Sequence, residues 1–201
     1  YLGESHETAK TFLSKVDLKK YDNPATFEEV LKDIDAVAPG NHAAKAAVDI
    51  ALHDWLGKKL GFAWHQVWGL NPAKTPVTTF TIGIDKDKEV IRQKVREADI
   101  YKVLKVKLGR DNDKEMIETI REVTDKPLRA DVNQGWKDKE YALKMIEWLA
   151  TKGVEFIEQP MPKEMRDEHA WLKERSPMPI IGDESVVRLT DVKKAWGAYH
   201  G

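Results

Sequence analysis

Two lysines and three acidic residues recur at a nearly constant interval in the second half of this sequence. Lys105 and Lys107 stand in a run that alternates apolar and charged residues and ends at a glycine, the pattern of a strand entering a turn. Similar runs deliver carboxylates at Asp131, Glu158 and Asp183, in steps of 24, 27 and 25 residues from Lys107 onward. Because barrel enzymes carry their chemistry at the carboxyl ends of parallel strands, we expect these side chains to converge.

The three acidic residues are predicted to hold a divalent cation. Carboxylates brought this close together repel one another, so they require a positive charge between them. Oxygen ligands without histidine or cysteine suit a hard ion, which makes Mg²⁺ the first expectation and Mn²⁺ the second. A substrate carboxylate is a natural further ligand for such an ion.

The lysine pair is predicted to act on a substrate bound at that cation. Two residues along a strand separate Lys105 from Lys107 by about 7 Å, where their repulsion at an effective dielectric constant near 20 is about 2.4 kcal/mol. This repulsion lowers one proton affinity, whereas the nearby carboxylates raise it, and the sequence leaves the net sign open. A lysine base beside a metal-bound carboxylate is an established arrangement for removing a proton alpha to that carboxylate.

Strands that alternate with helices are expected to position these residues. The expected strands cover residues 77–82, 104–109, 128–133, 154–160 and 179–184. The expected helices cover residues 87–98, 113–123 and 139–151, with a fourth ending near residue 175 and a fifth beginning near residue 190. This order predicts an α/β fold with a parallel sheet, and no glycine-rich phosphate loop follows a strand, which disfavours dinucleotide binding. Five units do not close an eight-stranded barrel, so we expect a fragment.

The preceding part of the sequence is expected to form a separate helical domain. Helices are predicted over residues 4–13, from residue 26 and over residues 42–59, and a proline-bounded stretch at residues 71–76 marks the boundary. The predicted domains are therefore residues 1–75, helical, and residues 77–201, the strand–helix array. In the third helix, the apolar face is predicted from the spacing of Ala43, Ala47, Ile50, Ala51 and Trp55.

Composition excludes several classes of function. The 201 residues are 41% hydrophobic and 33% charged, as in globular proteins with a core. A net charge of −1 gives no electrostatic reason to expect nucleic acid or a membrane as partner. The absence of cysteine excludes disulfides and thiolate chemistry. No long apolar run or signal-peptide pattern is present, so a cytoplasmic location is the default expectation.

Four motifs together resemble the enolase superfamily. They are Lys105-Val106-Lys107, Asp131-Val132-Asn133-Gln134, Glu158-Gln159-Pro160 and Gly182-Asp183-Glu184-Ser185. The run over residues 43–54 is also similar to the helix that precedes the barrel in that family. The match is to the subgroup of muconate-lactonizing enzymes, o-succinylbenzoate synthases and dipeptide epimerases. Residues 79–84 and 133–136 look most like dipeptide epimerases of the L-Ala-D/L-Glu type.

The resemblance implies a fold, a reaction and a role for each candidate residue. The fold would be the first five units of a modified TIM-like (β/α) barrel, preceded by the helical part of a capping domain. Lys107 would exchange the alpha proton on one face of the C-terminal residue of a dipeptide, and Lys105 would stabilise the resulting enolate. The ligands of Mg²⁺ would be Asp131, Glu158 and Asp183. The substrate contacts would be Thr81, Lys105 and Asn133.

Other functions stay open at this point. The family's second catalytic lysine, on its sixth strand, and its Asp-x-Asp pair, on its eighth, have no counterpart in the five expected units. The same half-site could serve o-succinylbenzoate synthesis or cycloisomerisation, or bind metal without catalysis, and an unrelated open-sheet binding protein is a further alternative. The expected partner is a small-molecule carboxylate, with neither nucleic acid nor membrane, and a homo-oligomer stays open.

Overall fold

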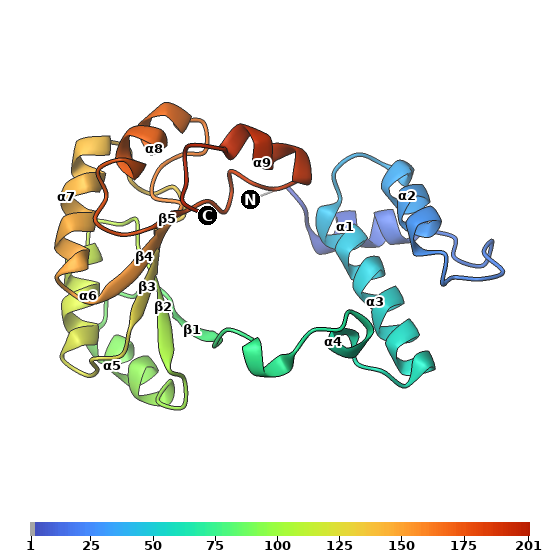
Figure 1. Cartoon of the computed structure of the whole chain (residues 1–201), viewed down its shortest axis with the longest axis horizontal. Coiled ribbons are helices and arrows are strands. Elements are labelled where there is room, and N and C mark those ends of the chain that lie inside the picture. Colours follow the sequence, from blue (N-terminus) through green and yellow to red (C-terminus); the bar gives the residue numbers. More distant parts are fainter. Residues whose placement is uncertain (1–2) are drawn as a thin grey trace. The chain divides into compact units, whose positions relative to one another are not determined.

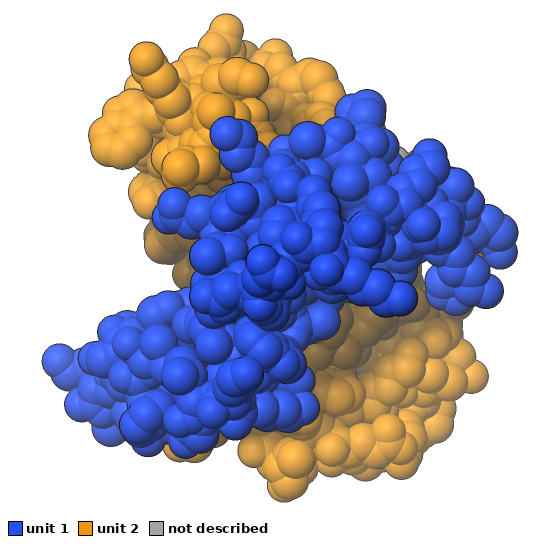
Figure 2. All heavy atoms as spheres, turned by 90° about the vertical axis from the view of Figure 1, so that its right-hand side faces the viewer, with its two compact units in different colours: residues 1–75 blue, residues 76–201 orange. Residues whose placement is uncertain are grey.

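The chain divides into a helical unit and a strand–helix unit, coloured separately in Figure 2. The structure, a computed structural model, describes residues 3–201, and the division falls between Thr75 and Pro76. Residues 1 and 2, where the predicted first domain begins, lie outside the described residues. Among the described residues, no helix is both long and apolar enough to cross a membrane. The assignment of the two units to a capping and a catalytic domain stays a prediction.

A five-stranded parallel sheet forms the second unit (Figure 1). Its strands, which pair in sequential order, are β1 (Thr79–Ile82), β2 (Val103–Lys107), β3 (Leu128–Asp131), β4 (Val154–Glu158) and β5 (Ile180–Ile181). The helices that follow them are α5 (Lys88–Glu97), α6 (Asp113–Arg121), α7 (Lys139–Ala150), α8 (Arg166–Lys173) and α9 (Leu189–Ala195). Figure 1 shows α5, α6 and α7 on the same side of the sheet. The predicted α/β array is confirmed.

Alternation along β2 separates the core from the polar face of the sheet. Leu104 and Val106 are fully buried and Leu108 is nearly so, and all three belong to the main apolar cluster. Burying a side chain of this size stabilises the fold by about 1.5–3 kcal/mol. Lys105 and Lys107 lie between these residues and are half-buried. The core therefore fixes the direction in which both lysines point.

The fifth strand is shorter than predicted. It ends at Ile181, whereas the sequence pattern predicted a strand to residue 184. Beyond it the backbone N–H of Gly182 donates to the Gly201 carbonyl, and the N–H of Asp183 donates to the side-chain oxygen of Gln159. Successive N–H groups of a parallel strand point to alternate edges, so the Asp183 N–H is the next donor on the side of β4. It bonds to a side chain instead of to the β4 backbone, and the ladder with β4 ends there.

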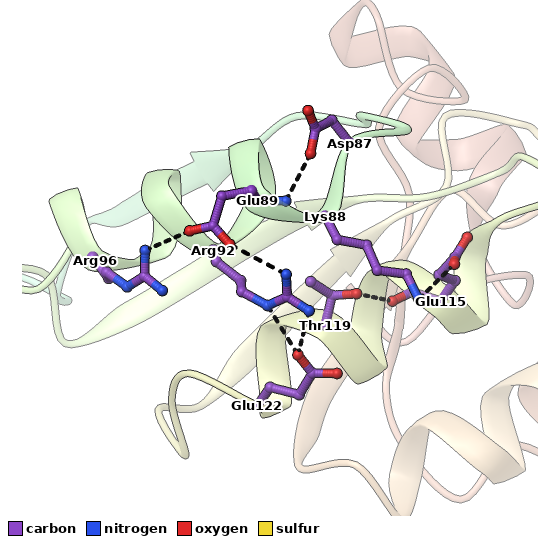
Figure 3. Close-up of polar contacts among 8 residues, drawn as sticks. All are labelled: Asp87, Lys88, Glu89, Arg92, Arg96, Glu115, Thr119 and Glu122. Carbon is purple, nitrogen blue, oxygen red and sulfur yellow. Dashed lines mark hydrogen bonds and ion pairs between the residues drawn. The ribbon is translucent and has the colours of Figure 1, made fainter.

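Ion pairs connect α5 and α6 on the outside of the second unit (Figure 3). Arg92 of α5 donates to Glu122, just after α6, at 2.8 and 3.0 Å and also to Glu89 at 3.3 Å. Glu89 in turn accepts from Arg96 at 2.9 Å. A further pair joins Lys88 to Glu115 at 2.8 Å. We call these residues the α5–α6 network: Lys88, Glu89, Arg92, Arg96, Glu115 and Glu122.

Within residues 3–75, the described part of the first unit, there are four helices and one turn of 3₁₀-helix. They are α1 (His6–Leu13), α2 (Phe27–Val37), α3 (His42–Leu60), α4 (Trp64–Val67) and η1 (Pro72–Lys74). The Glu4 carboxylate accepts the N–H groups of His42 and Ala43 and so caps α3.

The predicted apolar face of α3 is wrong. The buried apolar side chains of α3 are those of Ala44, Val48 and Leu52, which pack with α1 and α2, whereas Ile50 is 68% exposed. Small apolar residues occur all round this helix, so their spacing does not identify the face that packs.

Candidate metal and acid–base site

The lysine pair and the three carboxylates meet at the carboxyl edge of the sheet. Lys107 pairs in register with Asp131, and Asp131 pairs with Glu158, so the parallel strands bring these residues side by side. Asp183 follows two residues after the end of β5. Ligand atoms of Asp131, Glu158 and Asp183 all lie within 4.8 Å of one another, the one such acidic or imidazole group among the described residues. The predicted convergence is therefore observed, while the roles of these residues stay predictions.

The two lysines contact different partners. The Nζ of Lys105 lies 2.8 Å from Oδ2 of Asp131 and 2.8 Å from both carboxylate oxygens of Glu158. The Nζ of Lys107 lies 2.6 Å from Oδ2 of Asp131 and 2.7 Å from Oδ1 of Asn133. Lys105 is thus held between two strands, whereas Lys107, at the end of β2, reaches the loop that follows β3.

The charge on Lys105 is stabilised by its partners. Burial alone would lower the pKa of Lys105, but hydrogen bonds and charges from Asp131 and Glu158 outweigh it, and the pKa is raised. The sign that the sequence left open is therefore positive for this lysine. A lysine that stays protonated suits a fixed positive charge better than a base.

The carboxylates are unequally compensated. Burial would raise the pKa of Asp131, but its bonds to Lys105 and Lys107 hold the pKa below its usual value. The pKa of Glu158 is raised, first by burial and then by repulsion from Asp131 and Asp183. The bond to Lys105 lowers it but does not offset these effects. Partial desolvation and the charges of Glu184 and Asp131 likewise raise the pKa of Asp183, the most exposed carboxylate of the three. Negative charge at this edge thus exceeds what the lysines neutralise.

A divalent cation fits this donor set. With Glu184, the cluster holds four carboxylates against two ammonium groups, a formal excess of two negative charges. Oxygens on opposite sides of Mg²⁺ lie about 4.2 Å apart, so groups within 4.8 Å need only small side-chain movements. All the candidate ligands are oxygens, as hard cations prefer.

Asn133 and Thr81, two of the predicted substrate contacts, lie on opposite sides of the lysine pair and differ in their hydrogen bonding and exposure. Asn133 has a left-handed backbone, with φ of 46°, its N–H donates to Asp131, and its side chain connects Lys107 to Glu184. Thr81 is exposed on β1 and pairs in register with Lys105. Both residues thus border the lysine pair, and their contact with a substrate stays a prediction.

Sequence reasoning missed a buried support beneath these loops. The Asp113 carboxylate, 2% exposed, accepts the N–H groups of Gly109 and Arg110 and the indole N–H of Trp136, each at 2.9 Å. It therefore ties the loop after β2 to the loop after β3. At Gly109 a Cβ atom would lie 2.4 Å from the Val132 carbonyl oxygen, so only glycine allows this approach.

A second support that sequence reasoning missed is Gln159, the residue after Glu158. Its side chain is fully buried and contacts the segment that carries Asp183. Gln159 belongs to the motif Glu158-Gln159-Pro160, which resembles the enolase superfamily, and this membership is the one feature of the sequence that could have marked it as functional.

Comparison with known proteins identifies both a family and close relatives. Residues 88–198 match the family described as enolase C-terminal domain-like. The chain is 56% identical over 202 residues to the L-Ala-D/L-Glu epimerase of Bacteroides thetaiotaomicron, an alignment covering 100% of this chain and 52% of that protein.

Solved structures share the fold. A dipeptide epimerase from Cytophaga hutchinsonii, complexed with Mg and the dipeptide D-Ala-L-Val, matches with a TM-score of 0.82 and 26% identity over 96% of this chain and 54% of that one. The 2-chloromuconate cycloisomerase of Rhodococcus opacus matches with a TM-score of 0.84 and 25% identity over 98% and 57%. The chain spans about half the length of the proteins it matches.

Proposed function

The chain belongs to the enolase C-terminal domain-like family, and from that premise we propose that it carries the metal site and one acid–base group of a Mg²⁺-dependent dipeptide epimerase. The family resemblance predicted from the sequence is confirmed. One observation supports the proposal above all: Lys107 lies beside three converging carboxylates at one sheet edge. Fold alone does not choose the reaction, because a cycloisomerase matches as well as an epimerase. The 56% identical relative favours the epimerase.

In this proposal Asp131, Glu158 and Asp183 hold the cation. When bound, Mg²⁺ would neutralise the carboxylate of the substrate and so acidify its alpha carbon. Asp131 also binds both lysines, so it sets the distance between the cation and the acid–base group.

Lys107 exchanges the alpha proton on one face of the substrate. Its neutral amine takes the proton, the C–H bond breaks, and the electron pair moves onto the carboxylate as an enolate. The ammonium group formed on Lys107 donates hydrogen bonds to Asp131 and Asn133, whose oxygens already lie 2.6 and 2.7 Å from Nζ. Return of a proton to the opposite face inverts the carbon, which requires a second acid, the lysine that the family carries on a later strand.

Lys105 supplies a permanent positive charge. Its raised pKa keeps it protonated, and its place one pleat deeper in β2 keeps it from the alpha carbon. A preorganised charge aimed at an enolate oxygen stabilises the transition state in both directions. Thr81 and Asn133 complete the substrate contacts of this proposal.

The proposed substrate is a dipeptide whose C-terminal residue keeps a free carboxylate. L-Ala-L-Glu and its epimer come first, because the 56% identical relative is named for that pair. A cytoplasmic location and assembly into a homo-oligomer both stay predictions.

Alpha-proton exchange in heavy water tests the proposal. The protein is incubated with L-Ala-L-Glu or L-Ala-D-Glu, with Mg²⁺ or with EDTA, and NMR follows deuterium at the C-terminal alpha carbon. We expect exchange that depends on Mg²⁺, and conversion of one epimer to the other in the complete protein, which in this proposal also carries the second acid. Metal binding without exchange would point to a non-catalytic homologue, and an elimination or ring-closure product to one of the family's other reactions.

A further inference from the structure

Asp183 is positioned differently from the other two carboxylates. Asp131 and Glu158 are the last residues of β3 and β4 and pair with each other in the sheet. The strand before Asp183 ends at Ile181, and the bond from the Gly182 N–H to the Gly201 carbonyl lies on the edge away from β4. No ladder pairing with β4 therefore fixes the segment that carries this carboxylate. Another group must hold it against its neighbours.

The side chain of Gln159 makes that connection. Its Oε1 accepts the backbone N–H of Asp183 at 3.0 Å and the N–H of Ser185 at 3.2 Å. These two bonds hold the turn from Asp183 to Ser185 against the residue that directly follows Glu158. The amide thus joins the second carboxylate to the third.

The other end of the amide is equally well defined. Its Nε2 lies 3.1 Å from the Met161 carbonyl, 2.9 Å from Ser185 Oγ and 3.1 Å from the Tyr199 hydroxyl. Two amide hydrogens therefore have three acceptors within reach. Exchanging the amide oxygen and nitrogen would turn donors toward donors, so the network permits one orientation of Gln159.

Backbone preference does not explain a glutamine at this position. Gln159 has φ of 38°, a left-handed conformation that is unfavourable for a residue with a long side chain, by about 1–3 kcal/mol. Asparagine and glycine adopt it more readily. Its N–H and carbonyl bond to Ile181 and Gln134, contacts that any residue other than proline could make. The reach of the glutamine side chain is what distinguishes it.

We propose that Gln159 is a positioning residue that sets the place of Asp183 in the cation site through its hydrogen bonds to the Asp183–Ser185 turn. The inference rests on the cation site of the proposed function. It assigns to Gln159 the part that strand pairing plays for Asp131 and Glu158.

Metal affinity in three variants tests this. Gln159→Asn keeps the amide and relieves the backbone but withdraws the oxygen by about one carbon–carbon bond, ~1.5 Å. Gln159→Met keeps the length and removes the hydrogen bonds. The matched control is Tyr199→Phe, which leaves two acceptors for the two amide hydrogens and so keeps Gln159 in place. Mg²⁺ and Mn²⁺ binding are measured by calorimetry, and melting temperature is measured in EDTA.

We expect both Gln159 variants to bind either cation about 10–100-fold more weakly, with Tyr199→Phe within about twofold of the original protein. Gln159→Asn is the decisive variant, because it should melt as high as the original protein in EDTA and still lose affinity. Unchanged affinity in Gln159→Asn, or an equal loss in Tyr199→Phe, would overturn this inference and leave the proposed cation site standing. If the original protein binds neither cation, the proposed cation site is wrong and this inference with it.

Discussion

Two clusters of charged residues in the second unit have similar ion-pair distances but differ in how fully their charges are compensated. The α5–α6 network is exposed and pairs at 2.8–3.3 Å (Figure 3), and the cluster at the sheet edge pairs at 2.6–2.8 Å. On the surface, the bond from Arg96 lowers the pKa of Glu89, and Glu122 raises the pKa of Arg92. Each of these charges is stabilised by its neighbours.

The sheet edge leaves charge uncompensated. There the pKa of Glu158 is raised by burial despite its bond to Lys105, and the pKa of Asp183 is raised as well. A cluster whose charges are unfavourable to the fold is typical of a functional site. The comparison teaches that ion-pair distance does not separate the two kinds of cluster, whereas the raised pKa values of Glu158 and Asp183 do.

The largest expected effect separates two lysines, one from each cluster. Lys107→Ala should reduce alpha-proton exchange from one stereoisomer by about 10²–10⁴-fold, because a general base is lost. In the complete protein, exchange from the other stereoisomer should persist through the second acid. Lys88→Ala, the control from the α5–α6 network, should leave both rates unchanged. NMR in heavy water with both epimers measures this, and equal loss from both in Lys107→Ala would contradict the assignment.

A smaller effect is expected at the deeper lysine of the site. Lys105→Ala should slow exchange from both stereoisomers, by about 10²–10³-fold, because it removes positive charge from an enolate common to both directions. The same incubation in heavy water reports it. An effect confined to one stereoisomer would mean that the two lysines have exchanged roles.

Much of this site could be predicted from local sequence pattern. Alternation placed Lys105 and Lys107 on one face of a strand, and a step of one strand–helix unit brought Asp131 and Glu158 beside them. Both rules act over short distances along the chain, so a sequence displays them directly.

The remaining features depend on contacts between distant residues. The end of β5 is decided by Gln159, 24 residues before Asp183, whose amide replaces a ladder partner. The buried face of α3 is decided by α1 and α2, because apolar residues surround that helix. Neither contact produces a periodic pattern in the sequence from which it could be predicted.

Neutralising one carboxylate of the site should have opposite effects with and without metal. Because the pKa of Asp183 is raised, its charge opposes folding, and Asp183→Asn should raise the melting temperature in EDTA by up to about 3 °C. With Mg²⁺ at about 100 times its dissociation constant, the original protein should gain about 2.7 kcal/mol, or about 5–10 °C, and the variant should lose this gain. Scanning calorimetry measures both. A lower melting temperature of the variant in EDTA would show that Asp183 is as well compensated as a surface charge.

The smallest effect is expected in the α5–α6 network, and its sign should be the reverse. Because the pKa of Glu89 is lowered from 4.5, its charge stabilises the fold above that pH, and this contribution is lost as the pH falls through the folded-state pKa. Glu89→Gln should therefore lower the melting temperature by about 1–2 °C at pH 7 and low salt, since exposed ion pairs contribute little. The difference from the original protein should shrink in 1 M salt, where the screening length is about 3 Å, and disappear well below pH 4.5. A rise in melting temperature at pH 7, like that expected for Asp183→Asn in EDTA, would remove the distinction between the two clusters.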